Sequence, residues 1–178
     1  MGTWGIKIFE DDITMDVRDY FNDYVNKGDS ISKATDKILH LLKDEIKDKD
    51  EGPLIYFSLA ELQMEKGILE INIKEKCLEC LKNGTSMDRW ISSGISQFLK
   101  RRKVLKEFIA RLKKFSNVVD KSNPNTEDIE SVPLEYTVYV LEDNNSQTKY
   151  VGKTSCFEKR KQYMENLFKN YRSKVIEQ

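Results

Sequence analysis

Apolar residues recur every three or four positions through most of the first 115 residues. Ile13, Val17, Phe21 and Tyr24, for example, fall on one face of a helix predicted from about 13 to 26. Glycines and short polar runs separate this segment from the next ones, which is typical of neighbouring antiparallel helices. The further helices are predicted at about 30–46, 53–66, 72–82 and 95–115.

The pattern changes after residue 115. Residues 116–133 are rich in Ser, Asn, Asp and Glu and contain two prolines, which indicates a linker. Apolar and aromatic residues then dominate at 136–141 and 149–153, on either side of a polar turn, and predict a β-hairpin. A charged helix is expected from Phe157 to about 175.

These elements predict an α+β fold in three parts. A mainly α-helical N-terminal domain covers 1–115, a linker covers 116–133, and a β-hairpin followed by a helix covers 134–178. Hydrophobic residues make up 39% of the 178 and charged residues 34%, so the chain can build a core. No apolar run of about 18 residues predicts a membrane helix. The first residues lack the basic lead and apolar stretch of a signal peptide, so we expect a cytoplasmic protein.

The cysteine and histidine positions do not predict a metal site. Cys77 and Cys80 form a lone CxxC within a helical pattern, and Cys156 makes the count odd. A zinc site would need two more ligands, and the single histidine, His40, stands apart. We therefore expect no metal and no cofactor, and we interpret the CxxC pair as small residues on a helix face.

The net charge of zero conceals an acidic front and a basic back. Residues 10–61 hold 14 acidic and 7 basic residues. Asp16, Asp19 and Asp23 are like charges spaced three or four apart, which disfavours a helix, and a core does not need them. They are predicted to contact a protein partner with a basic face. The alternative is that the acidic and basic halves of the protein attract each other.

Basic residues concentrate in the long helix predicted at 95–115. Lys100, Arg101, Arg102 and Lys103 are consecutive, so they point around the helix rather than along one face. With Lys153 they are the candidate nucleic-acid-binding residues of an alternative function. A solvated basic helix half, favoured by the helix dipole, is the simpler interpretation.

The stretch from Tyr136 to Arg160 resembles the first half of a GIY-YIG nuclease domain. Thr137-Val138-Tyr139 stands where that family has Gly-Ile-Tyr, Tyr150-Val151-Gly152 stands for Tyr-Ile-Gly, and Arg160 falls where the family carries its arginine. The resemblance implies that Tyr139, Tyr150 and Arg160 would serve phosphodiester cleavage. Magnesium would be the cofactor in that case only.

Two departures weaken the nuclease interpretation. Thr137 replaces the usual glycine of the first motif. The family also has a metal-binding glutamate on a later helix, and Glu158, Glu165 and Glu177 do not have its spacing. We therefore expect no cleavage of DNA or RNA.

Residues 1–115 resemble the bacterial domain of unknown function 4259 family. The resemblance is carried by the opening Met1–Gly5, by Phe9–Asp12 before a helix, and by Asp50–Pro53 before an aromatic helix. It implies no catalytic residues, and it points to toxin-immunity loci.

The function predicted from the sequence is non-enzymatic. We expect a cytoplasmic bacterial or phage protein that binds a macromolecular partner, with an immunity or inhibitor protein as one form of this function. The alternative is a GIY-YIG-related nucleic-acid-binding or nuclease protein that lacks the downstream metal-binding glutamate. A structural adaptor is a third alternative.

Overall fold

The computed structural model describes residues 4–84, 87, 90–91, 93–120, 134–143 and 145–168, and the backbone of 171–175. Its fold is α+β, as predicted: a mainly helical N-terminal part precedes strands and a C-terminal helix. The helical elements are α1 (Asp12–Asn26), α2 (Ile31–Leu41), the 3-10 turn η1 (Glu45–Lys47), α3 (Gly52–Glu65), α4 (Ile71–Lys82), α6 (Ile95–Lys114) and α7 (Phe157–Leu167). The strands are β1 (Leu69–Glu70), β2 (Val118–Val119), β3 (Thr137–Asp143), β4 (Thr148–Thr154) and β5 (Tyr171–Val175).

Side-chain caps and glycines set the ends of the first helices. The Asp11 carboxylate accepts a hydrogen bond from the Ile13 amide (3.1 Å) at the start of α1. The chain leaves α1 through Gly28, whose φ of 98° suits glycine. Ser30 caps α2 in the same way as Asp11 caps α1, through a bond from the Lys33 amide. Local sequence therefore defines both helices.

The centre of the helical part is α3. Its side chains are buried around most of its circumference, because α1 packs on one side of it and α4 on another. Phe57 of α3 meets Phe108 of α6 with ring centroids 5.6 Å apart. Fully buried residues from α1, α2 and α3, including Phe21, Ile38 and Leu59, extend this core.

A short parallel pairing joins β1, which lies just before α4, to β2, which lies just after α6. Leu69 of β1 pairs with Val118 of β2, and Glu70 pairs with Val119. The predicted linker, 116–133, thus contains β2, and 121–133 lie outside the described residues. The pairing holds the end of α6 beside the start of α4.

The C-terminal part is a three-stranded antiparallel sheet with one helix. The strand order is β4-β3-β5, so β3 is central. The helix predicted from Phe157 to about 175 ends at Leu167, and residues 171–175 form β5 instead. The free edge of β3 offers backbone hydrogen bonds to β5, with Leu141 opposite Ser173, and this pairing overrides the local helical signal.

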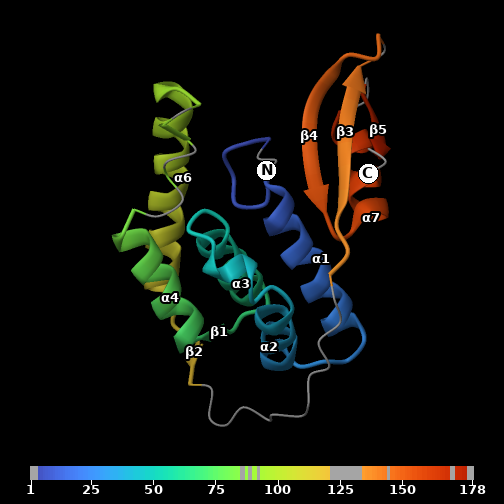
Figure 1. The fold of residues 1–178 in the computed structure, drawn as a ribbon. Coiled ribbons are helices and arrows are strands. Elements are labelled where there is room, and N and C mark those ends of the chain that lie inside the picture. The colour runs from blue at the N-terminus through green and yellow to red at the C-terminus, as the bar shows by residue number, and fades with distance from the viewer. Residues whose placement is uncertain are drawn as a thin grey trace.

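The sheet packs on the helical part through α1. Helix α1 lies between α3 on one side and the β3–β4 hairpin on the other (Figure 1). Its Val17 and Phe21 are fully buried in the helical core. Its acidic first turns are left to meet the sheet and α7.

Candidate functional site

Two tyrosines of the sheet converge on one carboxylate of α1. The Tyr139 hydroxyl of β3 donates to Asp12 Oδ1 (2.8 Å), and the Tyr150 hydroxyl of β4 donates to Asp12 Oδ2 (2.9 Å). Their ring centroids are 6.0 Å apart. Tyr139 pairs with Gly152 and Tyr150 with Leu141 across the hairpin, which places both tyrosines on the same face of the sheet.

Arg160 of α7 completes this arrangement. Its guanidinium donates through Nη1 to Asp12 Oδ1 and through Nη2 to Asp16 Oδ1 (2.8 Å). Nη2 also donates to the Asp12 carbonyl oxygen (3.1 Å). The side chain is 0% exposed and lies 5.4 Å from the ring centroid of Trp4. Charge-assisted bonds of this kind are the strong ones in a protein interior.

Asp16 lies one helical turn after Asp12 and binds the end of β4. Its carboxylate accepts bonds from the Thr154 hydroxyl, the Ser155 hydroxyl (2.8 Å) and the Ser155 amide (2.9 Å). Asp16 is 1% exposed. We call Asp12, Asp16, Tyr139, Tyr150 and Arg160 the carboxylate–arginine cluster.

Gly152 lets α1 approach the sheet this closely. A Cβ atom at this position would lie 2.6 Å from both Asp12 Oδ2 and the Tyr139 ring. The next amide, that of Lys153, donates to Asp12 Oδ2 (3.1 Å). The glycine of the Tyr-Val-Gly motif is therefore required here by the packing of α1 against the hairpin.

Burial dominates the electrostatics of the cluster. It raises the pKa of Asp12 to about 6, although Arg160 and the two tyrosines act in the opposite direction. Burial, and then the charge of Asp12, raise the pKa of Tyr139 and of Tyr150 well above the usual tyrosine value. Both tyrosines therefore carry their protons at neutral pH, which is unfavourable for a general base.

The donors of the cluster form an anion-binding arrangement, and the carboxylates of Asp12 and Asp16 occupy it. Four hydroxyl groups, a guanidinium and two backbone amides surround the carboxylates of Asp12 and Asp16. A phosphate group would have to displace α1 in order to reach Arg160. The arrangement as it stands joins the sheet and α7 to α1.

The three aspartates predicted to contact a partner are placed differently from one another. Asp16 is buried, so the prediction of an exposed contact residue is wrong for it. The Asp19 side chain is 13% exposed and lies 3.8 Å from Arg18. Asp23 pairs with Lys159 of α7 (2.6 Å) at the surface. For Asp16 and Asp23, the alternative that the acidic and basic halves attract each other is confirmed.

Arg101 is a second correction. It was a candidate for binding nucleic acid, but it is 1% exposed. Its guanidinium donates to the carbonyl oxygens of Ile6 (2.8 Å) and Lys7 (2.9 Å) and lies 5.3 Å from the Trp90 ring centroid. The arginine holds the N-terminal segment against α6, so it is not available to a phosphate.

The other candidate cations lie at the surface but do not form one site. Lys100, Arg102 and Lys103 are exposed on α6. The Lys153 ammonium lies 3.8 Å from the Tyr136 ring centroid, beside the sheet. Figure 1 shows α6 and the sheet on opposite sides of α1 and α3.

Asp12 is the site residue that sequence reasoning missed. It lies in the first turn of α1, next to Asp11, which provides the cap. The available signal was the four-residue spacing of Asp12 and Asp16, which places both carboxylates on one helix face. Two carboxylates on one buried face require a cation nearby, and in the fold this cation is Arg160.

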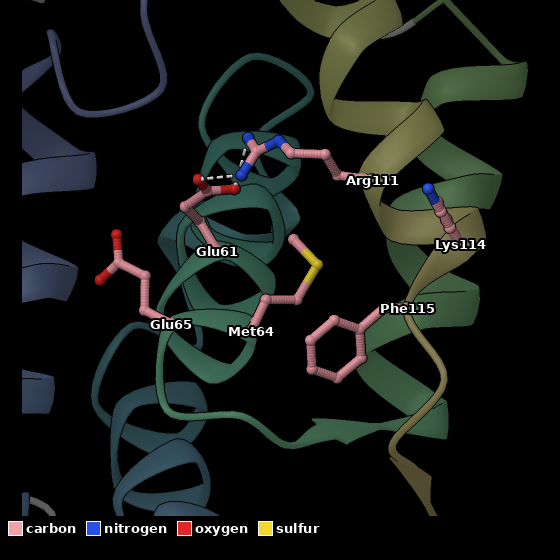
Figure 2. Close-up of a pocket in the computed structure, with 6 residues that line it drawn as sticks. All are labelled: Glu61, Met64, Glu65, Arg111, Lys114 and Phe115. Carbon is pink, nitrogen blue, oxygen red and sulfur yellow. Dashed lines mark hydrogen bonds and ion pairs between the residues drawn. The ribbon is translucent and has the colours of Figure 1, made fainter.

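A groove lies between α3 and α6, away from the cluster (Figure 2). It encloses about 370 Å³, and Arg111 crosses its rim to bind Glu61 with two hydrogen bonds of 2.6 and 2.9 Å. None of the cluster residues contributes to it. The lining residues are Glu61, Met64, Glu65, Arg111, Lys114 and Phe115.

The described part of the chain contains no group of three or more His, Cys, Asp or Glu residues that could hold a metal ion. No disulfide links Cys77, Cys80 or Cys156. Among the described residues, no helix combines the length and the hydropathy needed to cross a membrane. Comparisons of the chain with protein-family models, curated proteins and solved structures found no match.

Proposed function

We propose that this protein is a non-catalytic cytoplasmic binding protein that acts on a macromolecular partner, in the manner of an immunity or inhibitor protein. One observation carries the proposal. The three groups that the nuclease resemblance assigns to cleavage, on Tyr139, Tyr150 and Arg160, are all bonded to the carboxylates of α1. The absence of disulfides among the three cysteines fits a reducing compartment.

Phosphodiester hydrolysis needs a base, a cation that faces the transition state, and space for the substrate. The raised pKa values of Tyr139 and Tyr150 disfavour their use as a base. The pairing of Arg160 with two carboxylates leaves it unable to act as the cation. Space could be made only by moving α1. The opposite face of α1 carries Phe21 into the helical core, so this movement would expose core residues.

The partner contact through Asp16, Asp19 and Asp23 must be revised under this proposal. Asp23 alone keeps a substantially exposed carboxylate, with 46% of its side chain accessible. A partner with a basic face would have to compete with Lys159 for it. We infer that the partner contact includes a surface outside α1.

A cleavage assay tests the absence of catalysis. The full-length protein is incubated with plasmid DNA and with RNA in magnesium and in manganese, and we expect no product. Cleavage that is lost in both Tyr150→Phe and Arg160→Ala, and retained in Tyr56→Phe, would contradict the proposal. Tyr56 is the matched control because it is a half-buried tyrosine of α3, outside the cluster.

A second candidate function is favoured by the convergence of Tyr139, Tyr150 and Arg160 at one point. In this alternative the unit is a GIY-YIG-related nucleic-acid-binding or nuclease unit, with magnesium as its cofactor, that α1 blocks. The double variant Asp12→Asn, Asp16→Asn keeps hydrogen-bonding groups at both positions and removes the competing charge. The alternative expects this variant to bind a labelled oligonucleotide more tightly than wild type. Equal binding would contradict it.

A further inference from the structure

Helix α6 carries exposed residues along one face, with the half-buried Ile109 between Lys106 and Lys113. Ile95 and Leu99 are 79% and 54% exposed, although both are large and apolar. Arg102, Lys106 and Lys113 continue the same face at helical spacing, and all three are exposed. From Ile95 to Lys113 the stripe is about 27 Å long, at 1.5 Å per residue. We call these five residues the α6 stripe.

The cations of the α6 stripe are not neutralised within the described part of the chain. The ion pairs there include none made by Arg102, Lys106 or Lys113. The helix contains a single acidic residue, Glu107. Arg111, by contrast, pairs with Glu61 of α3. The positive charge of the stripe is therefore available to a partner.

The core-facing side of α6 already has its packing partners. Leu105, Phe108 and Leu112 are buried in the helical core. The first turns of α6 extend beyond α3 and α4 (Figure 1), so the apolar end of the stripe is the part that stands furthest from the core. Ile95 and Leu99 therefore add apolar surface that the described part of the fold leaves exposed.

We propose that the α6 stripe binds an acidic, amphipathic helical segment of a protein partner. Apolar side chains of that segment would cover Ile95 and Leu99, and its carboxylates would pair with Arg102, Lys106 and Lys113. This inference rests on the proposed function, because it names the surface and the partner chemistry of a protein that works by binding. The apolar residues lie at the start of α6 and the basic residues follow. This order along the helix sets the orientation of the partner segment.

The stripe fits an acidic polypeptide better than a nucleic acid or a lipid surface. Single-stranded nucleic acid is bound by aromatic side chains that stack on bases, and the stripe has none. A duplex backbone would gain nothing from Ile95 and Leu99. A helix that lies in a membrane interface needs an apolar face along its whole length. The α6 stripe is apolar only at Ile95 and Leu99, at one end.

A synthetic helical peptide tests this inference on the full-length protein. The probe carries two leucines four residues apart, followed by glutamates at three- and four-residue spacing, and its scrambled form has the same composition. Fluorescence anisotropy should show saturable binding of the probe, and binding of the scrambled form at least tenfold weaker. Arg102→Glu with Lys106→Glu should weaken probe binding at least tenfold. Ile95→Ser with Leu99→Ser should do the same.

The matched control reverses charge elsewhere on the surface. Lys43→Glu with Lys49→Glu changes two exposed lysines outside α6, and probe binding should stay within twofold of wild type. A probe with lysines in place of its glutamates should bind the Arg102→Glu, Lys106→Glu variant and not wild type. Thermal melting checks that each variant is folded.

Four results would overturn the inference. The first two are the absence of saturable binding and equal binding of the scrambled peptide. The third is an oligonucleotide that binds more tightly than the peptide probe and whose affinity is unchanged by Ile95→Ser with Leu99→Ser. The fourth is self-association of the protein that these two changes abolish. The last two would assign the stripe to a nucleic acid or to a second copy of the chain.

Capture from a lysate of the native host separates this inference from the proposed function. A protein that is retained by wild type and by the Lys43→Glu, Lys49→Glu control, lost with Arg102→Glu and Lys106→Glu, and displaced by the peptide probe supports both. Retention by all variants overturns the inference and leaves the proposed function standing. If wild type retains no macromolecule, the proposed function fails, and the peptide measurements decide the inference alone.

Discussion

Replacing Arg160 with methionine should show how strongly the sheet unit is held on α1. The guanidinium is 0% exposed and donates three hydrogen bonds to Asp12 and Asp16. Methionine fills similar volume but leaves two buried carboxylates without their cation. Breaking a buried ion pair from one side costs about 3–5 kcal/mol. For a chain of this length each kcal/mol shifts the melting temperature by about 2–4 °C, so a fall of roughly 6–20 °C is expected.

The cost should also depend on pH. Without Arg160 the carboxyl group of Asp12 loses the charge that favours its ionised form, so its pKa in the folded state rises further. The folded variant then binds protons more tightly than the unfolded chain in mildly acidic solution. Its destabilisation relative to wild type should therefore be smaller at pH 5 than at pH 8. Urea unfolding at both pH values measures this difference.

Two further variants make the test specific. Lys159→Met removes the neighbouring surface cation of α7, whose pair with Asp23 is about half exposed, and should cost less than about 1 kcal/mol. Arg160→Met combined with Asp12→Asn and Asp16→Asn leaves no buried charge, so it should recover part of the lost stability. If Arg160→Met costs no more than Lys159→Met, the cluster does not hold the sheet unit in solution and the reasoning fails.

Three other predictions use the same unfolding measurement. The pKa of Asp12 is about 6 in the folded state, above the ordinary 3.8, so its contribution to stability is present below pH 4 and is lost as pH rises through 6. Asp12→Asn should remove this dependence, which is worth about 3 kcal/mol. Gly152→Ala should destabilise the fold by about 1–3 kcal/mol, since its methyl group meets the Asp12 carboxylate, whereas Val151→Ala at an exposed site should change stability by less than about 0.5 kcal/mol. Trp4→Ala should cost about 2 kcal/mol, because the ring is partly buried against Arg160.

Most of the helical part could be predicted because its signals are local. Apolar spacing gave α1, α4 and α6 with ends within a few residues of those observed. Pro53 at the start of α3 and Gly67 after its end have the roles expected for these residues. The hairpin was also visible, because β3 and β4 flank a polar turn at close range.

Features that depend on distant partners could not be predicted in this way. β5 forms because β3 has a free edge, and no pattern within residues 171–175 shows that edge. Asp16 and Arg101 are charged residues on helices, for which the usual environment is solvent. Asp16 is buried because it bonds to Arg160, which lies 144 positions later in the sequence. Arg101 is buried because it bonds to the Ile6 carbonyl, which lies 95 positions earlier. The spacing within α1 shows that Asp12 and Asp16 share a face, but it does not identify Arg160 as their partner.

The pairing of α1 with α7 also has a consequence for a chain that folds while it is synthesised. Asp12 leaves the ribosome 148 residues ahead of Arg160, so the helical part can assemble around α3 before the cation exists. During that interval α1 can bury Phe21 while Asp12 and Asp16 remain hydrated. Closure of the sheet unit over these carboxylates has to wait until Arg160 has been synthesised. A chain that terminates early would keep an acidic face on α1, and this face chemically distinguishes incomplete products from the finished protein.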